Sequence, residues 1–373
     1  MKKFAEYLTA SCWLVSLCLF TGKTFALPLD TLNLPEGFTV SIFAEVENPR
    51  QMTRSDTGII YVGSRSANKV HAVIDRDGDF TADEVVLVDK GMEWPTGVTW
   101  HQGTLYVGSI GTLLAYPDID RQFRSSPEPQ VISEAYPDKK HHGWKYLKAG
   151  PDGYLYVPVG APCNICLSEE PVFASITRFN LADKTFEPWV HGVRNTVGFD
   201  WHPQTGRLWF TDNGRDMMGD DIPPCELNEV TAAGEHFGYP FFHGNSLPDP
   251  EFGAGKTAAD YKEPALALGP HVAPLGMTFY RGNQFPAEYR QQVFIAEHGS
   301  WNRSPDAGHT GYRVTLARDD GRGKLRYEVF MDGWLQADNT AWGRPADVLE
   351  LPDGSLLISD DRANVIYRVS YKK

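Results

Sequence analysis

The chain has 373 residues, of which 42% are hydrophobic and 22% charged, the composition of an ordinary globular protein. Its formal net charge is −13, which argues against nucleic acid or an anionic membrane surface as the partner, because both attract clustered Lys and Arg. An anionic ligand could bind only where arginines are concentrated locally.

Residues 1–26 have the pattern of a secretory signal peptide. Lys2 and Lys3 form a basic start, 9–22 is a short apolar stretch, and 24–26 is a small-residue cleavage site. The apolar stretch is too short for a membrane span. We therefore expect an exported protein, periplasmic or secreted, that has no membrane span after cleavage. Removal of three Lys and one Glu, a net +2, leaves −15 on residues 27–373.

Short strands recur along the rest of the chain. After an early strand at 38–43, a Gly-initiated apolar and aromatic segment is repeated at intervals of 45 to 85 residues. The repeats lie at 58–62, 103–107, 153–157, 206–210, 291–295 (where Gln replaces Gly) and 354–358. Such repeats are typical of a radial array of four-stranded sheets. The sequence predicts an all-β, six-bladed β-propeller over 27–373, in which 38–43 completes the last blade and hides an edge.

A second recurring segment precedes each repeat and is expected to be the innermost strand of its blade. The residues at or near the starts of these strands are Arg50, His142, Arg194, Asn195, His271 and Arg344. Unpaired charge is costly in a packed core, so these side chains indicate a polar pocket on the axis for an anionic cofactor or substrate. A channel that is merely hydrated is the alternative.

The loop at 75–83 is a candidate calcium site. The carboxylates of Asp75, Asp77, Asp79 and Asp83, with the carbonyl of Thr81, have the spacing of a calcium-binding loop. Phe80 stands where such loops usually have Gly, so a solvated acidic turn is the alternative. Because the loop follows an outer strand, any bound metal would be structural.

Three cysteines remain after residue 26, namely Cys163, Cys166 and Cys225. An odd number allows at most one disulfide within a monomer, and the sequence does not say which pair forms it. Further along, the interval 216–270 is rich in Pro, Gly and Asp. We expect it to be a long loop over one face and not a second domain.

Residues 27–373 resemble the soluble quinoprotein sugar dehydrogenases over nearly their whole length, in particular the sorbosone and aldose sugar dehydrogenases. The matching stretches are 34–38, 191–195, 209–215, 226–228, 238–240, 297–303 and 343–347. The resemblance implies a six-bladed propeller, in agreement with the repeats. It also implies pyrroloquinoline quinone in the axial pocket, with Ca²⁺ beside it.

The resemblance further implies roles for individual residues. His142 is the expected general base, with its neighbour His141 as the other candidate, and Arg194 and Asn195 are expected to face the quinone carbonyls. The backbone carbonyls of Gly214 and Arg215 are expected to bind the Ca²⁺. The carboxylates of the cofactor are assigned to Arg344, Arg303 and Arg313.

The expected function is therefore oxidation of an aldose or related hydroxy-aldehyde, with hydride transfer to the quinone and onward transfer of electrons to an external acceptor. A neutral imidazole can take the substrate hydroxyl proton near neutral pH. A Ca²⁺-dependent lactone hydrolase is one alternative, and it predicts acidic side chains along the axis. A propeller that binds sugar or protein without catalysis is the other.

Overall fold

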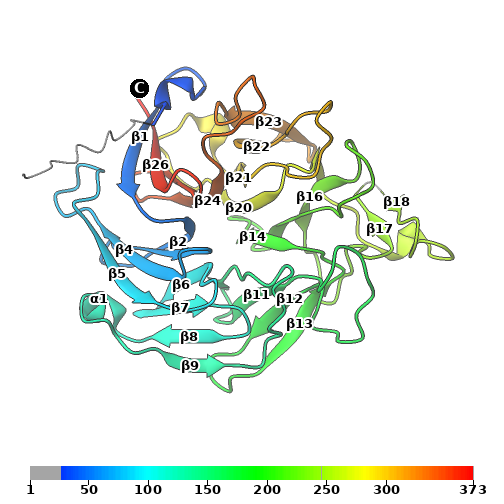
Figure 1. Ribbon diagram of the computed structural model, residues 1–373, viewed down its shortest axis with the longest axis horizontal. Coiled ribbons are helices and arrows are strands. Elements are labelled where there is room, and N and C mark those ends of the chain that lie inside the picture. The colour runs from blue at the N-terminus through cyan, green and yellow to red at the C-terminus, as the bar shows by residue number, and fades with distance from the viewer. Residues whose placement is uncertain (1–26, 245, 373) are drawn as a thin grey trace, which may run out of the picture.

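The computed structural model describes residues 27–244 and 246–372, which form six four-stranded antiparallel sheets arranged around one axis (Figure 1). In chain order the sheets are β2–β5, β6–β9, β10–β13, β14–β16 with β19, β20–β23, and β24–β26 with β1. The innermost strands contact their counterparts in neighbouring sheets, as β2 does with β6 and β24. The predicted six-bladed β-propeller is confirmed.

The strands have four positions in the blades. The innermost are β2 (Pro49–Arg54), β6 (Gly97–His101), β10 (Lys148–Ala149), β14 (Thr196–Trp201), β20 (Pro274–Phe279) and β24 (Pro345–Glu350). The second are β3 (Ile60–Ser64), β7 (Thr104–Gly108), β11 (Leu155–Val159), β15 (Leu208–Asp212), β21 (Val293–Glu297) and β25 (Leu356–Asp360). The third are β4 (Lys69–Ile74), β8 (Leu113–Tyr116), β12 (Ser175–Phe179), β16 (Pro224–Glu229), β22 (Arg313–Asp319) and β26 (Val365–Tyr371). The outermost are β5 (Glu84–Lys90), β9 (Gln130–Ser133), β13 (Phe186–His191), β19 (Leu266–Pro270), β23 (Leu325–Met331) and β1 (Phe38–Glu45).

The recurring sequence segment corresponds to the second strand of each blade. In β3, β11, β15, β21 and β25 every residue is buried, because neighbouring blades cover both faces of the sheet and favour a continuous apolar run. The Gly that begins the segment lies in the turn from the innermost strand and has positive φ, for example 82° at Gly103 and 83° at Gly153. Glycine adopts this left-handed backbone without steric cost.

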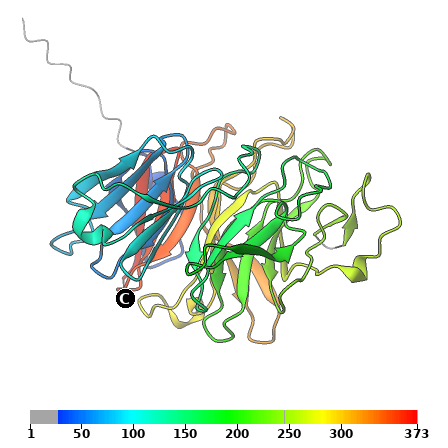
Figure 2. The ribbon, with the colours of Figure 1, turned by 90° about the horizontal axis from the view of Figure 1, so that it is seen from below.

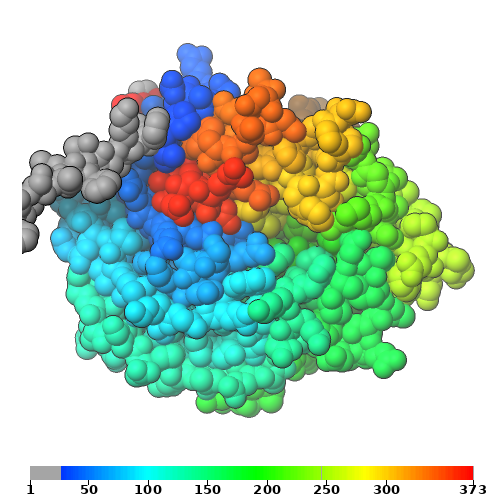
Figure 3. Space-filling model, viewed as in Figure 1, coloured from blue at the N-terminus to red at the C-terminus, as the bar shows by residue number. Residues whose placement is uncertain are grey.

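The ring closes through β1, as predicted from the strand at 38–43. β1 pairs antiparallel with β26, with Phe38 opposite Tyr371, so segments from the two ends of the described chain adjoin (blue and red in Figure 3). The Phe38 ring packs edge-on against Phe285 and Phe330, at centroid distances of 4.8 and 5.0 Å. This closure covers an edge of the last blade that would otherwise present unpaired backbone groups.

The interval 216–270 was predicted to be a long loop, and this was wrong in part. It contains β16 and β19, the third and fourth strands of the fourth blade. Between them a small hairpin, β17 (Phe242–His243) and β18 (Leu247–Pro248), stands out at the side of the disc (Figures 1 and 2). β16 was missed because its buried positions include Glu226 and Asn228, which break the apolar pattern on which strand prediction depends.

The predicted signal peptide at 1–26 lies outside the described residues and stays a prediction. Within the described ranges, no helix combines the length and apolar character needed to cross a membrane. The helical elements there are one turn of α-helix, α1 (Ile119–Gln122), and three short 3-10 turns at Leu29–Thr31, Ala258–Asp260 and Ala287–Tyr289.

Candidate functional site

A cavity of about 550 Å³ lies where the six blades meet, and we call it the axial cavity. In an antiparallel sheet the start of the innermost strand and the end of the second strand lie at the same edge. Residues at or shortly before the start of the innermost strand line the cavity in every blade, and they include Arg50, Trp94, His142, Arg194, His271 and Arg344. In the first, fourth and fifth blades, residues that follow the second strand line it as well. The sequence-based expectation that inner-strand starts converge on one pocket is therefore supported by the geometry.

Four of the lining residues other than Gly adopt left-handed backbone conformations. Trp94, His142, His271 and Ala273 have φ of 50°, 50°, 57° and 52°, values that are uncommon for residues other than Gly. Each lies shortly before the innermost strand of its blade. Such backbone strain is tolerated where the surrounding structure fixes it, and it is frequent at functional sites.

The lining of the axial cavity is strongly cationic although the whole chain is acidic. Among the described residues it includes five Lys and Arg side chains and a single carboxylate, that of Asp216. The cations are Arg50, Arg65, Lys140, Arg194 and Arg344. A concentration of one charge sign in a concave site attracts ligands of the opposite charge.

Two of these guanidinium groups have no carboxylate partner within ion-pairing distance among the described residues. Arg65 lies over the indole rings of both Trp94 and Trp144, with its guanidinium carbon 4.7 and 4.9 Å from their centroids. Arg344 donates to the carbonyls of His298 and Gly299, at 2.8 and 2.7 Å. Burial lowers the pKa of both guanidinium groups, and the nearby charge of Arg50 adds to this effect. An anionic ligand would relieve this concentration of positive charge.

His142 presents a nitrogen that can accept a proton. Its Nδ1 lies 2.9 Å from the Ala161 carbonyl, a contact that requires the proton to be on Nδ1 and leaves the lone pair on Nε2. Nε2 has no hydrogen-bond partner among the described residues. Burial, followed by the charge of Arg194 and the neighbouring ring of His141, lowers the pKa of His142 well below 6.5. His142 is therefore neutral at physiological pH.

Arg194 is held rigidly at the wall of the cavity. Its Nε donates to the Asn164 carbonyl, and its Nη2 donates to Asn164 Oδ1 and Asp216 Oδ2, at 2.8 to 2.9 Å. Its Nη1 donates to the carbonyls of Asn213 and Gly214, at 3.2 and 2.9 Å. All five N–H groups of the guanidinium are thus directed at protein acceptors. Arg194 supplies a fixed positive charge, and donation to a bound quinone would require it to give up one of these bonds.

Asn195 also lines the axial cavity. Its backbone N–H donates to Asp212 Oδ1 at 2.7 Å, while its side-chain amide has no partner among the described residues. That amide is therefore available to a ligand. The position of Asn195 is compatible with a cofactor role, which stays a prediction.

The structure places two of the predicted cofactor residues outside the lining of the axial cavity, and their cofactor role stays a prediction that these positions do not favour. Arg313 does not line the axial cavity, because its Nε pairs with the fully buried Glu297 at 2.8 Å. Arg303 points to the Ala307 carbonyl and lies 3.7 Å from the exposed Asp221. Of the three arginines assigned to the cofactor carboxylates, only Arg344 lines the cavity.

The carbonyls assigned to Ca²⁺ do not form an evident cation site. The Gly214 carbonyl accepts a hydrogen bond from the positively charged Arg194. Arg215 is not part of the lining, and its side chain pairs with the buried Asp249. Asp216, the one carboxylate of the cavity, is already paired with Arg194. A divalent cation at Gly214 would meet this guanidinium charge, so the present arrangement does not fit calcium.

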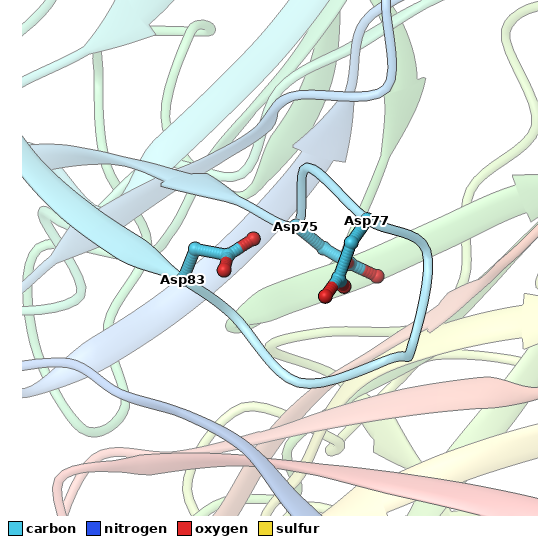
Figure 4. A group of neighbouring side chains, drawn as sticks. All are labelled: Asp75, Asp77 and Asp83. Carbon is cyan, nitrogen blue, oxygen red and sulfur yellow. The ribbon is translucent and has the colours of Figure 1, made fainter.

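The 75–83 loop gathers some of its predicted ligands. Oxygen atoms of Asp75, Asp77 and Asp83 lie within 4.8 Å of one another (Figure 4). Asp79 is not part of this group, and its carboxylate accepts from the backbone N–H of Thr81 at 2.7 Å. Metal binding by this loop stays a prediction.

Sequence reasoning missed several residues of the cavity, among them Arg65, Trp94, Lys140 and Trp144. Arg65 directly follows β3, so the end of each recurring strand was the signal that could have found it. The cysteines had been left open, and the structure pairs Cys163 with Cys166 while Cys225 is buried and unpaired.

The fold and the cavity define a class of protein, a six-bladed propeller with a cationic ligand-binding cavity on its axis. The family model of glucose/sorbosone dehydrogenases matches residues 174–300. An uncharacterized protein of Borreliella burgdorferi is 35% identical over an alignment of 361 residues that covers 92% of each chain. The chain belongs to the glucose/sorbosone dehydrogenase family.

Similar proteins with described cofactors are more distant. The pyrroloquinoline quinone-dependent pyranose dehydrogenase of Coprinopsis cinerea is 23% identical over 84% of this chain, which spans about half, 48%, of that protein. The holo form of its quinone domain superposes with a TM-score of 0.74 at 17% identity, covering 91% of this chain and 97% of that one. The quinone-bound aldose sugar dehydrogenase of Streptomyces coelicolor gives a TM-score of 0.62 at 15% identity, covering 91% and 100%. These likenesses show the shared fold.

Proposed function

We propose that this protein is a pyrroloquinoline quinone-dependent dehydrogenase that oxidises an aldose or a related hydroxy-aldehyde. The observation that carries the proposal is the axial cavity, in which Arg65 and Arg344 lack carboxylate partners within the described chain while the neutral His142 presents Nε2. Family membership and the quinone-bound relatives support the same reading.

The residues present fit this quinone, a planar anion with three carboxylate groups. Arginine offers a planar fork of donors to a carboxylate, and Arg344 with Arg65 would hold these groups. Arg50, which pairs with Asp361 at 2.9 Å, adds charge beside them. A cavity of about 550 Å³ is of the size usual for cofactor sites, roughly 300–1,000 Å³.

When bound, the quinone would supply the acceptor for the hydride from the sugar carbon. The protein would supply the base, the orientation and the charge. His142 would take the hydroxyl proton at Nε2, and its Nδ1–H, directed at the Ala161 carbonyl, would keep the ring in the required tautomer. Arg194, fixed by Asn164 and Asp216, would stabilise negative charge that develops nearby.

We assign no step to calcium, because Arg194 occupies the Gly214 carbonyl. The lactone hydrolase predicted acidic side chains along the axis, and the described lining instead contains Arg, Lys, His and Asn with one aspartate. That alternative is therefore not favoured.

We also propose that the protein is exported and passes electrons to an external acceptor. The basic and apolar pattern of residues 1–26 supports export. The pairing of Cys163 with Cys166 supports it as well, because disulfides persist mainly in oxidising compartments.

The proposal is tested by adding pyrroloquinoline quinone to purified apoprotein, recording the spectrum of the bound cofactor, and then following reduction of an artificial dye with a panel of aldoses. We expect a bound-quinone spectrum and sugar-dependent dye reduction. His142→Gln should keep the spectrum and lose turnover. Binding without turnover on any aldose would refute the proposed substrate class, and the absence of a bound spectrum would refute the cofactor.

A further inference from the structure

The disulfide between Cys163 and Cys166 closes a loop whose Asn164 contacts Arg194, a lining residue of the axial cavity. The bond closes a four-residue loop that follows β11 in the third blade, and its Cα atoms are 6.2 Å apart. Both cysteines are partly exposed, so a small reductant can reach them. The loop connects this surface disulfide with a charged group of the site.

Asn164, inside the closed loop, makes four hydrogen bonds to the wall of the cavity. Its carbonyl accepts from Arg194 Nε and its Oδ1 accepts from Arg194 Nη2, both at 2.8 Å. Its Oδ1 also accepts from the Asp216 backbone N–H at 2.8 Å, and its Nδ2 donates to the Asp216 carbonyl at 3.0 Å. Asn164 therefore takes two of the five donors of Arg194 and also holds the backbone of the residue that pairs with Arg194.

The loop is anchored on its other side by Tyr239, a buried residue from the segment between β16 and β17. The Cys166 backbone N–H donates to the Tyr239 hydroxyl at 3.0 Å, and Cys163 Sγ lies 3.6 Å from the same oxygen. The backbone of Asn164 is thus fixed between a covalent bond and a buried hydroxyl. The disulfide fixes the distance between the two ends of this short loop, and opening it removes that restraint on the backbone of Asn164.

We propose that Asn164, locked by the Cys163–Cys166 disulfide, is a positioning residue that holds the Arg194 guanidinium at the wall of the axial cavity. Opening the disulfide releases Asn164, and Arg194 then loses two of its acceptors and moves relative to the ligand. In the opening step a dithiol donates two electrons and two protons, the S–S bond breaks to give two thiols, and the dithiol becomes its cyclic disulfide. The positioning is a property of the protein alone, whereas its consequence for the quinone rests on the proposed function.

The first test follows Arg194 itself in the apoprotein. In protein labelled with ¹⁵N-arginine, the Arg194 Nε–H resonance is assigned from its absence in Arg194→Lys, and its exchange with solvent is measured before and after dithiothreitol. We expect exchange to become at least tenfold faster on reduction, while circular dichroism shows an intact fold. The Cys163→Ser/Cys166→Ser double variant should show the fast exchange without reductant and no further change with it. An unchanged resonance after complete reduction would overturn the proposal.

A second set of variants keeps the test decisive if loss of the disulfide unfolds the protein. Asn164→Ala leaves the disulfide intact and should accelerate Arg194 exchange, and Asn164→Asp, which keeps the Oδ acceptor, should restore part of the protection. Asn180→Ala, in the turn between β12 and β13, is the matched control and should change nothing. Protection that is equal in wild type and Asn164→Ala would refute the role of Asn164.

Quinone titration separates this inference from the proposed function. For the Cys163→Ser/Cys166→Ser variant we expect Kd for pyrroloquinoline quinone to rise about tenfold, which corresponds to about 1.4 kcal/mol. If wild type binds no quinone but Arg194 still responds to reduction, the positioning role stands and the proposed function fails. If wild type binds quinone and both Kd and Arg194 exchange are indifferent to the disulfide, the positioning role fails and the proposed function stands.

Discussion

Gly160 determines whether His142 can occupy its present position. This residue directly follows β11, and a Cβ added to it would lie 2.5 Å from His142 Cβ and 2.9 Å from the His142 carbonyl oxygen. Ordinary contacts begin at 3.4 Å, so in Gly160→Ala the backbone and ring of His142 must move by roughly 1 Å. Misplacement of a reacting group by about 1 Å can cost about 100-fold in rate. We therefore expect kcat/KM for sugar-dependent dye reduction to fall about 100-fold.

The assay is run with saturating quinone, and quinone affinity is measured separately and should change less than about threefold. The matched control is Gly153→Ala, at the opposite end of the same strand. Gly153 has φ of 83° and nothing within 4 Å of an added Cβ, so alanine there costs stability of about 1–2 kcal/mol but leaves His142 in place. Activity in Gly160→Ala above half the wild-type value, with the quinone bound, would refute the role of this contact.

Further predictions follow from the charges around the axis. Because the pKa of His142 is lowered well below 6.5, kcat/KM should stay flat from pH 8 to pH 6.5, and a loss of activity centred at pH 6.5 or above would contradict this. Burial raises the pKa of Asp347 to about 7 from 3.8, so the folded state retains a proton that the unfolded state releases, and this contribution to stability is lost as pH rises between these values. In urea unfolding, the free energy of unfolding should fall less over that pH window in Asp347→Asn than in wild type. Equal dependence of the unfolding free energy on pH in the two proteins would refute this role of Asp347. The Ca²⁺ prediction is tested in a protein whose 75–83 loop is neutralised by Asp→Asn changes, with and without Arg194→Ala. Calorimetry should show tighter Ca²⁺ binding with Arg194→Ala, because the guanidinium no longer competes for the Gly214 carbonyl. Equal Ca²⁺ affinities of the two proteins would argue against that competition.

The periodic repeat made much of the fold and part of the site predictable. Once the innermost strands were located, their starts had to converge, which placed Arg50, His142, Arg194 and Arg344 together. The resemblance then named roles for His142 and Arg344, which both line the cavity, and those roles stay predictions. The strands and the convergence of these residues could be predicted because each depends on one strand and its place in the repeat.

The remaining features depend on contacts that a single sequence does not contain. Arg313 was assigned to the cofactor, but the pairing of β21 with β22 sets it opposite Glu297, a buried carboxylate that neutralises it. The contact of Arg65 with the two indoles of Trp94 and Trp144 joins the first blade to loops of the second and third. The contact of Asn164 with Arg194 spans 30 residues and depends on a disulfide that the cysteine count alone could not assign.

The central claim is that the axial cavity binds a carboxylated quinone through guanidinium groups that lack carboxylate partners in the described chain. An equilibrium titration of apoprotein with pyrroloquinoline quinone tests this claim most directly. We predict a micromolar or lower Kd for wild type and Kd values raised at least tenfold in Arg65→Ala and in Arg344→Ala. The control is Arg207→Ala, which removes a half-exposed surface arginine paired with Glu229 and should leave Kd equal to that of wild type. Absence of saturable binding to wild type, or equal Kd values for all four proteins, would contradict the account.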